Sequence, residues 1–169
     1  MPKITALLHA HNDALHLGRA LDSLRSCDEV LVIDEGSEDD ASRVAREHGA
    51  TLKTALPGVT LGAYAADAAH DWILCLRSNE TLSDDLEAAL FDWKNEGPAE
   101  NVAGYRISIR EQNGNGEWQS CPPETRLVNR KLVNWIGEMP PDEPGEMKLS
   151  GATCCAFLNR RDNQNTLWT

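Results

Sequence analysis

The sequence predicts an α/β fold in which a mixed, mostly parallel sheet is flanked by helices. In the first half of the 169-residue chain, short apolar runs alternate with stretches whose apolar residues recur at helical spacing. Such alternation is typical of parallel strands joined by right-handed crossover helices. The second half shows apolar-polar alternation and hairpin residues instead, which indicate an antiparallel C-terminal part.

The parallel half is predicted to contain four strands, each followed by a helix or a turn. The strands are expected over residues 4–8, 29–34, 51–55 and 72–76. Asn12 or Asp13 is expected to cap the first helix, and Ser83 the helix after the fourth strand, because short polar side chains satisfy the free N–H groups of a first turn. A third helix with the inner positions Leu61, Tyr64, Ala65 and Ala68 is expected before residue 72.

The antiparallel part is predicted to begin near Tyr105. Asn113-Gly114-Asn115-Gly116 favours a tight hairpin turn, because asparagine and glycine tolerate positive φ. Further strands are expected over 124–128 and 151–157. Residues 1–158 are interpreted as a single domain, and residues 159–169 as a polar C-terminal tail.

Charge and cysteine content narrow the partners and the compartment. With 27 acidic against 16 basic residues the net charge is -11, which would repel nucleic acid, so no nucleic-acid partner is predicted. Five cysteines without a CxxC spacing indicate a reduced, cytoplasmic compartment. No apolar run approaches the roughly 20 residues of a membrane-spanning helix, so no transmembrane segment is expected.

Polar residues follow three of the predicted parallel strands, where ligands bind in open parallel sheets. The three stretches are His9-Ala10-His11-Asn12-Asp13, Asp34-Glu35-Gly36-Ser37-Glu38-Asp39 and Arg77-Ser78-Asn79-Glu80. His9 and His11 share one face of a strand but lack an evident third ligand, so no metal site is predicted from them. An anionic ligand at this edge would need a local positive group, because the chain as a whole is acidic.

The stretches ITALLHAHNDALHLGRALDSL and EVLVIDEGSEDDASRVAREHGA resemble the opening of family 2 glycosyltransferases of GT-A fold. In that family the first strand ends in P-x-x-N-E and the second in V-D-x-G-S-x-D. Asn12 and Asp13 stand in the first signature, and Asp34, Gly36, Ser37 and Asp39 match the second. The likeness continues through His70 to Leu74 and through Thr125 to Arg130, and it covers most of the first 137 residues.

The resemblance implies a GT-A fold and a nucleotide-sugar donor, with an unknown acceptor. It assigns nucleotide binding to His11, Asn12, Asp13, Asp34, Glu35, Ser37 and Asp39. The family's Asp-x-Asp motif, which holds a divalent cation on the diphosphate, falls on Arg77 and Asn79. A guanidinium repels a metal ion, so Mg²⁺ or Mn²⁺ would lack its usual ligands and no other cofactor is implied.

Four of these residues also have a structural interpretation. Asp34 could cap the following turn, and Ser37 and Asp39 are more typical of capping groups than of ligands. Arg77 could pair with Glu80 or Asp84, or it could grip a diphosphate by a bidentate fork without a metal ion.

Two further positions differ from the family's usual residues. Two functional hypotheses follow from these changes together with those at Arg77 and Asn79. Leu61-Gly62 replaces a basic residue followed by asparagine, and Met139-Pro140-Pro141 replaces a His-Glu pair, while Asp142 and Glu143 offer carboxylates without an assigned role. The first hypothesis is a glycosyltransferase-like protein that binds a nucleotide-sugar, with any transfer assisted by Arg77. The alternative is a non-catalytic binding or regulatory module that retains the fold.

Overall fold

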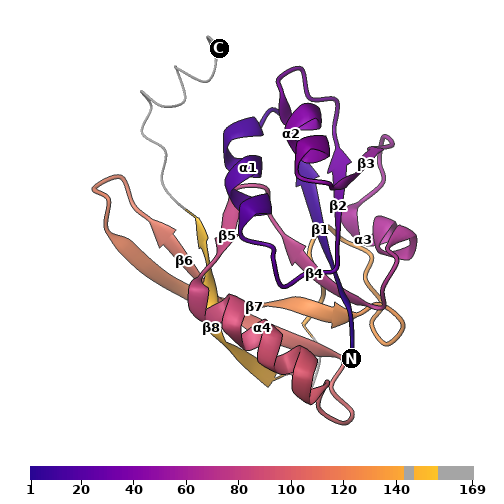
Figure 1. Cartoon of the computed structure of the whole chain (residues 1–169), viewed down its shortest axis with the longest axis vertical. Coiled ribbons are helices and arrows are strands. Elements are labelled where there is room, and N and C mark those ends of the chain that lie inside the picture. The colour runs from indigo at the N-terminus through magenta and orange to yellow at the C-terminus, as the bar shows by residue number, and fades with distance from the viewer. Residues whose placement is uncertain (143–146, 156–169) are drawn as a thin grey trace.

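The computed structural model describes residues 1–142 and 147–155, and within them the strands form one eight-stranded sheet (Figure 1). The strand order is β3-β2-β1-β4-β7-β6-β8-β5. The strands are β1 (Ile4–Ala10), β2 (Glu29–Asp34), β3 (Thr51–Thr54), β4 (Trp72–Leu76), β5 (Glu80–Leu82), β6 (Gly104–Gln112), β7 (Trp118–Asn129) and β8 (Met147–Cys155). The helices are α1 (Ala14–Asp22), α2 (Ala41–Glu47), α3 (Leu61–Tyr64), the 3-10 helix η1 (Ala65–Asp67) and α4 (Asp84–Glu96).

The four parallel strands are present where predicted, although β1 continues to Ala10 and β3 ends at Thr54. β1 pairs in parallel with β2 and with β4, so Leu7 lies between Leu31 and Cys75. β3 joins the outer edge of β2, also in parallel. Because these strands run the same way, the segments that follow β1, β2 and β4 leave the sheet at one edge, which we call the carboxyl edge.

The antiparallel half is confirmed for β6 and β7, which form a long hairpin, and β7 also pairs antiparallel with β4. β8 departs from the expectation, because it pairs in parallel with β6 and antiparallel only with the short strand β5. The connection between β7 and β8 explains this direction. β7 ends opposite Gly104 and β8 starts opposite Tyr105, so the chain re-enters the sheet beside the start of β6.

The two faces of the sheet carry separate cores. Successive residues of β1 and β4 alternate between them, as the side-chain period of a strand requires. One core lies under α1, α2 and α4, and its rings Trp72 and Trp93 meet edge to face with centroids 4.9 Å apart. The other core is covered by α3, η1 and the segment around Trp135.

The first helix lacks its expected cap, because Asp13 stands at the N-cap position of α1 but makes no side-chain cap hydrogen bond. Ser83 accepts a hydrogen bond from the Leu86 N–H at 3.2 Å, so it caps α4 as predicted. The helix expected over 61–68 is shorter, because Arg130 takes the carbonyls of Ala65 and Ala68 at 2.9 and 2.6 Å. None of the described helices has the length and apolar character that crossing a membrane requires.

Candidate functional site

The three polar stretches predicted at the carboxyl edge do meet there (Figure 1). The loop after β4 contacts the loop after β1, since the Ser78 hydroxyl donates to the Asp13 carboxylate at 2.7 Å. The loop after β1 contacts the loop after β2, since the Asn12 N–H donates to the Ser37 hydroxyl at 3.1 Å. Sequence reasoning therefore places the candidate site on one continuous edge of the fold.

The first two loops are fastened to each other by the predicted nucleotide-binding residues. The Asn12 side-chain oxygen accepts from the Glu38 N–H at 2.8 Å, and Asn12 itself has a positive φ of 52°. His11 places its Nδ1 2.9 Å from the carbonyl oxygen of Glu35. Both His11 and Glu35 are exposed, so these contacts fix the loop and leave its outer surface open to a ligand.

Asp34 and Asp39 act as structural acceptors in this loop. The Asp34 carboxylate accepts from the Ser37 N–H and from the Ser42 hydroxyl, each at 3.1 Å. The two Asp39 oxygens accept from Ala14 and Ala41, the first residues of α1 and α2, each at 3.0 Å. The capping interpretation therefore describes both residues, whereas Asp40, the N-cap position of α2, makes no side-chain cap.

Arg77 is held from one side by two carboxylates. Its Nη1 lies 3.1 Å from Glu80 Oε1 and 3.5 Å from Glu124 Oε2. Its Nε and Nη2 have no hydrogen-bond partner among the described residues, and 48% of its side chain is exposed. The predicted pairing with Glu80 is present, and half of the guanidinium fork remains available.

Behind Arg77 lies a buried ion pair that sequence reasoning missed. Arg126 and Glu80 are 0% and 1% exposed, and Arg126 Nη1 and Nη2 donate to the two Glu80 oxygens at 2.6 and 2.8 Å. Arg126 also contacts Glu124 Oε2 through Nε at 3.0 Å. The available signal was an arginine directly before the apolar pair Leu127-Val128, since a charge in a buried strand requires a partner.

The electrostatics of the Arg126–Glu80 pair favour the ionised forms of both side chains. Burial alone would raise the pKa of the Glu80 carboxyl, but the hydrogen bonds and charge of Arg126, with Arg77, bring this pKa below its usual value. Glu80, Arg126, Arg77 and Glu124 together carry no net charge. The charge of Arg77 is therefore balanced within this network.

The residues here do not fit a divalent metal ion. Arg77 supplies a positive charge, and Asn79 supplies at most a neutral oxygen. In the described part of the chain no three His, Cys, Asp or Glu side chains are placed to share a metal ion. His9 does not change this, although its Nδ1 lies 3.0 Å from Glu138 Oε2 and 3.5 Å from Glu35 Oε1.

Residues 135–140, which we call the strap, pack over the face of the sheet that α3 and η1 also cover. Glu138 bridges His9 and the Leu61 N–H, and its carbonyl lies 3.9 Å from the Cys75 thiol. The Trp135 ring is so close to Gly62 that a Cβ there would meet it at 2.5 Å. Leu61-Gly62 therefore serves to seat the strap. Glu138 was not predicted, because a lone carboxylate in a loop carries no spacing signal.

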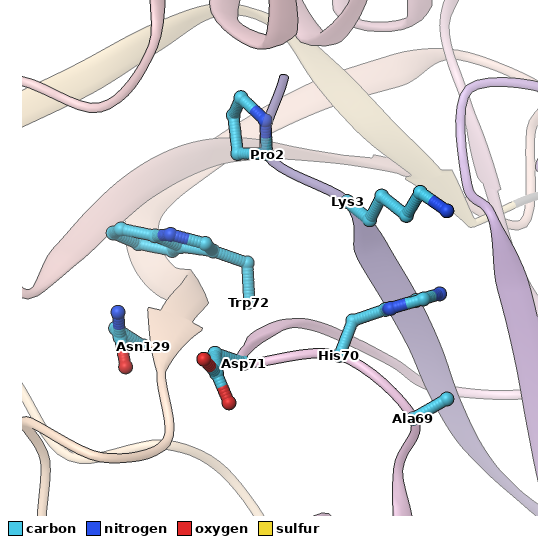
Figure 2. Close-up of a pocket in the computed structure, with 7 residues that line it drawn as sticks. All are labelled: Pro2, Lys3, Ala69, His70, Asp71, Trp72 and Asn129. Carbon is cyan, nitrogen blue, oxygen red and sulfur yellow. The ribbon is translucent and has the colours of Figure 1, made fainter.

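Other predicted residues have local roles. Asp142 accepts a hydrogen bond from Thr125 at 2.9 Å, whereas Glu143 and the tail 159–169 lie outside the described residues. A cavity of about 400 Å³ lies at the opposite edge of the sheet (Figure 2). It is lined by Pro2, Lys3, Ala69, His70, Asp71, Trp72 and Asn129. This cavity adjoins the starts of β1 and β4, so it is separate from the carboxyl edge.

Comparisons with known proteins agree with this fold. No known protein-family model matches the chain. An uncharacterized glycosyltransferase of Rickettsia felis is 28% identical over 80% of the chain, and one of Rickettsia prowazekii is 32% identical over 80%. The matches cover 50% and 49% of those proteins, so the chain spans about half the length of these curated relatives.

Solved structures share the architecture at low sequence identity. The structure of Staphylococcus aureus TarS residues 1–349 in complex with UDP-GlcNAc superposes with a TM-score of 0.66 at 16% sequence identity. The match covers 93% of this chain and 59% of the TarS chain. Glucosyl-3-phosphoglycerate synthase of Mycobacterium tuberculosis, in complex with Mn²⁺, UDP and glucosyl-3-phosphoglycerate, superposes with a TM-score of 0.58 at 16% sequence identity. This match covers 98% of this chain and 76% of the synthase chain. The chain thus has the mixed α/β fold of GT-A glycosyltransferases, and its relatives by sequence are named as glycosyltransferases.

Proposed function

We propose that this protein is a family 2-like glycosyltransferase domain that binds a nucleotide-diphosphate sugar at the carboxyl edge. The observation that carries the proposal is the state of Arg77, which two carboxylates hold by Nη1 while Nε and Nη2 are free of partners among the described residues. A guanidinium fixed in this way presents two parallel N–H groups, the arrangement that binds a phosphate in bidentate fashion.

The position of Arg77 supports a contact with the diphosphate. Leu8 and Leu76 pair in the β1–β4 ladder, so Arg77 leaves β4 beside His9, which is still paired with Ile33 of β2. The fastened loops after β1 and β2 lie next to them and supply the exposed groups of His11 and Glu35 for the nucleoside. TarS and the synthase, which share the fold, were solved with UDP-GlcNAc and with UDP.

In this proposal the positive charge at the diphosphate is part of the protein. Arg77 would stabilise the charge that develops on the leaving nucleoside diphosphate, so donor binding would not require Mg²⁺ or Mn²⁺. The chain contributes the Arg77 guanidinium, which Glu80 holds in place, and the buried Arg126–Glu80 ion pair behind it. The acceptor and the general base have no assigned residues.

A second candidate, a non-catalytic nucleotide-sugar-binding or regulatory module, is favoured by the strap. Glu138 and Met139 lie against His9 and Cys75, near the carboxyl ends of β1 and β4, and would narrow the room beside a donor bound there. Release of free sugar or transfer to any acceptor from a bound donor would separate the first candidate from the second. Donor binding with neither reaction would support the module.

Thermal unfolding with a panel of nucleotides tests the binding proposal. A ligand at one hundred times its dissociation constant raises the free energy of unfolding by about 2.7 kcal/mol. Uridine or guanosine diphosphates are expected to raise the melting temperature of the wild-type protein in EDTA, and Arg77→Ala is expected to abolish the shift. A shift that requires Mn²⁺ would refute the metal-independent site, and no shift with any nucleotide would refute nucleotide binding.

A further inference from the structure

Glu124 lies 3.5 Å from Arg77 Nη1, on the same guanidinium whose Nε–Nη2 edge is proposed to bind the anion. We infer that Glu124 is an affinity-limiting residue of the carboxyl edge, an internal carboxylate that weakens the binding of nucleoside diphosphate. The inference rests on the proposed function, because it assumes that Arg77 is the anion contact. It adds a role for a residue that the sequence did not single out.

The geometry distinguishes Glu124 from Glu80. Glu80 is buried, and its two oxygens are taken by Arg126 at 2.6 and 2.8 Å, so it belongs to the structural pair. Glu124 has 42% of its side chain exposed and offers a single oxygen, Oε2, to both Arg126 and Arg77. Its distance of 3.5 Å from Arg77 Nη1 is longer than that of a close ion pair, so this contact can be exchanged.

The charge of Glu124 is expected to weaken the binding of a diphosphate at Arg77. Because the formal charges of the two arginines and two glutamates cancel, the cluster as a whole adds no net positive charge to attract a diphosphate. Asp13, which accepts from Ser78 in the adjoining loop, adds a negative charge nearby. Neutralising Glu124 would leave the cluster with one net positive charge and would remove a repulsion that acts over a few ångströms.

Substitution of Glu124 by glutamine tests this role, because glutamine keeps the side-chain shape and removes the charge. Glu124→Gln is expected to bind UDP roughly three- to tenfold more tightly than wild type in EDTA at low salt. The gain should shrink as ionic strength rises, since the contact is partly exposed. Glu96→Gln, which removes the same charge at the exposed end of α4, is the matched control and is expected to leave the affinity unchanged.

Calorimetric titration of UDP and of inorganic pyrophosphate into wild type, Glu124→Gln, Glu96→Gln and the double variant Arg77→Ala/Glu124→Gln separates the outcomes. A gain in affinity for UDP that is confined to Glu124→Gln and is lost in the double variant supports the inference. Wild-type binding that depends on Arg77 but is unchanged or weakened in Glu124→Gln would overturn the inference and leave the proposed function standing. Absence of binding in both wild type and Glu124→Gln would overturn the two together.

Discussion

Arg126 and Glu80 form a buried bidentate ion pair that joins β7 to the start of β5, with N–O distances of 2.6 and 2.8 Å. Arg126 also donates to the Cys75 carbonyl at 3.2 Å, so the pair ties the end of β4 into the same network. Arg77 and Glu124 extend the network to the surface. A structural device in the core thus sets the orientation of the residue proposed to contact the ligand.

Removing one partner of this pair should destabilise the fold. Glu80→Gln leaves the buried Arg126 guanidinium with only the partly exposed Glu124 as a counter-charge, and breaking a buried pair in this way costs about 3–5 kcal/mol. Urea unfolding of Glu80→Gln measures this loss. Glu96→Gln serves as the surface control, and a loss in Glu80→Gln no greater than in that control would show that the pair contributes little.

The same pair predicts a loss of stability in acid. The folded-state pKa of Glu80 lies below its usual value of 4.5, so the unfolded chain binds a proton more readily than the folded chain does. The stabilisation from ionised Glu80 is therefore complete above pH 4.5 and is lost as the pH falls through the folded-state pKa. Urea unfolding from neutral to acidic pH should show this decline, and Glu80→Gln should show a shallower one.

Gly62 should tolerate no side chain. A Cβ at this position would meet Trp135 Cδ1 at 2.5 Å and the Trp135 carbonyl oxygen at 2.6 Å, so Gly62→Ala must push the strap away from α3. Overpacking of this kind costs about 1–3 kcal/mol. Gly18→Ala in α1 is the matched control, because its nearest neighbour would lie at 3.6 Å and alanine favours a helix. Equal melting temperatures for the two variants would contradict the packing described for the strap.

Much of the fold could be predicted because its signals are local. The apolar run before Arg77 and the Ser83 cap both appear in the structure as expected. The short strand β5 was not predicted, because three residues carry little periodicity and its pairing with β8 depends on a distant segment. The parallel direction of β8 was not predicted either, since it follows from where the connection after β7 re-enters the sheet.

The location of the candidate site could be predicted from the sequence, but fewer of the contacts within the site could be. The sequence brought Asp13, Asp34 and Arg77 to one edge, because the ends of parallel strands meet there. It offered a capping role for Asp34, but it could not show the hydrogen bond from the Ser42 hydroxyl, since that residue reaches Asp34 only after the loop has folded. The roles of the predicted nucleotide-binding residues toward a ligand stay predictions.

The most direct measurement of the central claim is a calorimetric titration of UDP in EDTA into wild type, Arg77→Lys and Arg77→Ala. Lysine keeps the charge but lacks the free Nε–Nη2 edge of the arginine, so a bidentate contact predicts weakened binding in Arg77→Lys and no detectable binding in Arg77→Ala. Wild-type binding in EDTA with this order of affinities is the expected result. Equal affinity in all three proteins, or binding that appears only when Mn²⁺ is added, would contradict the account.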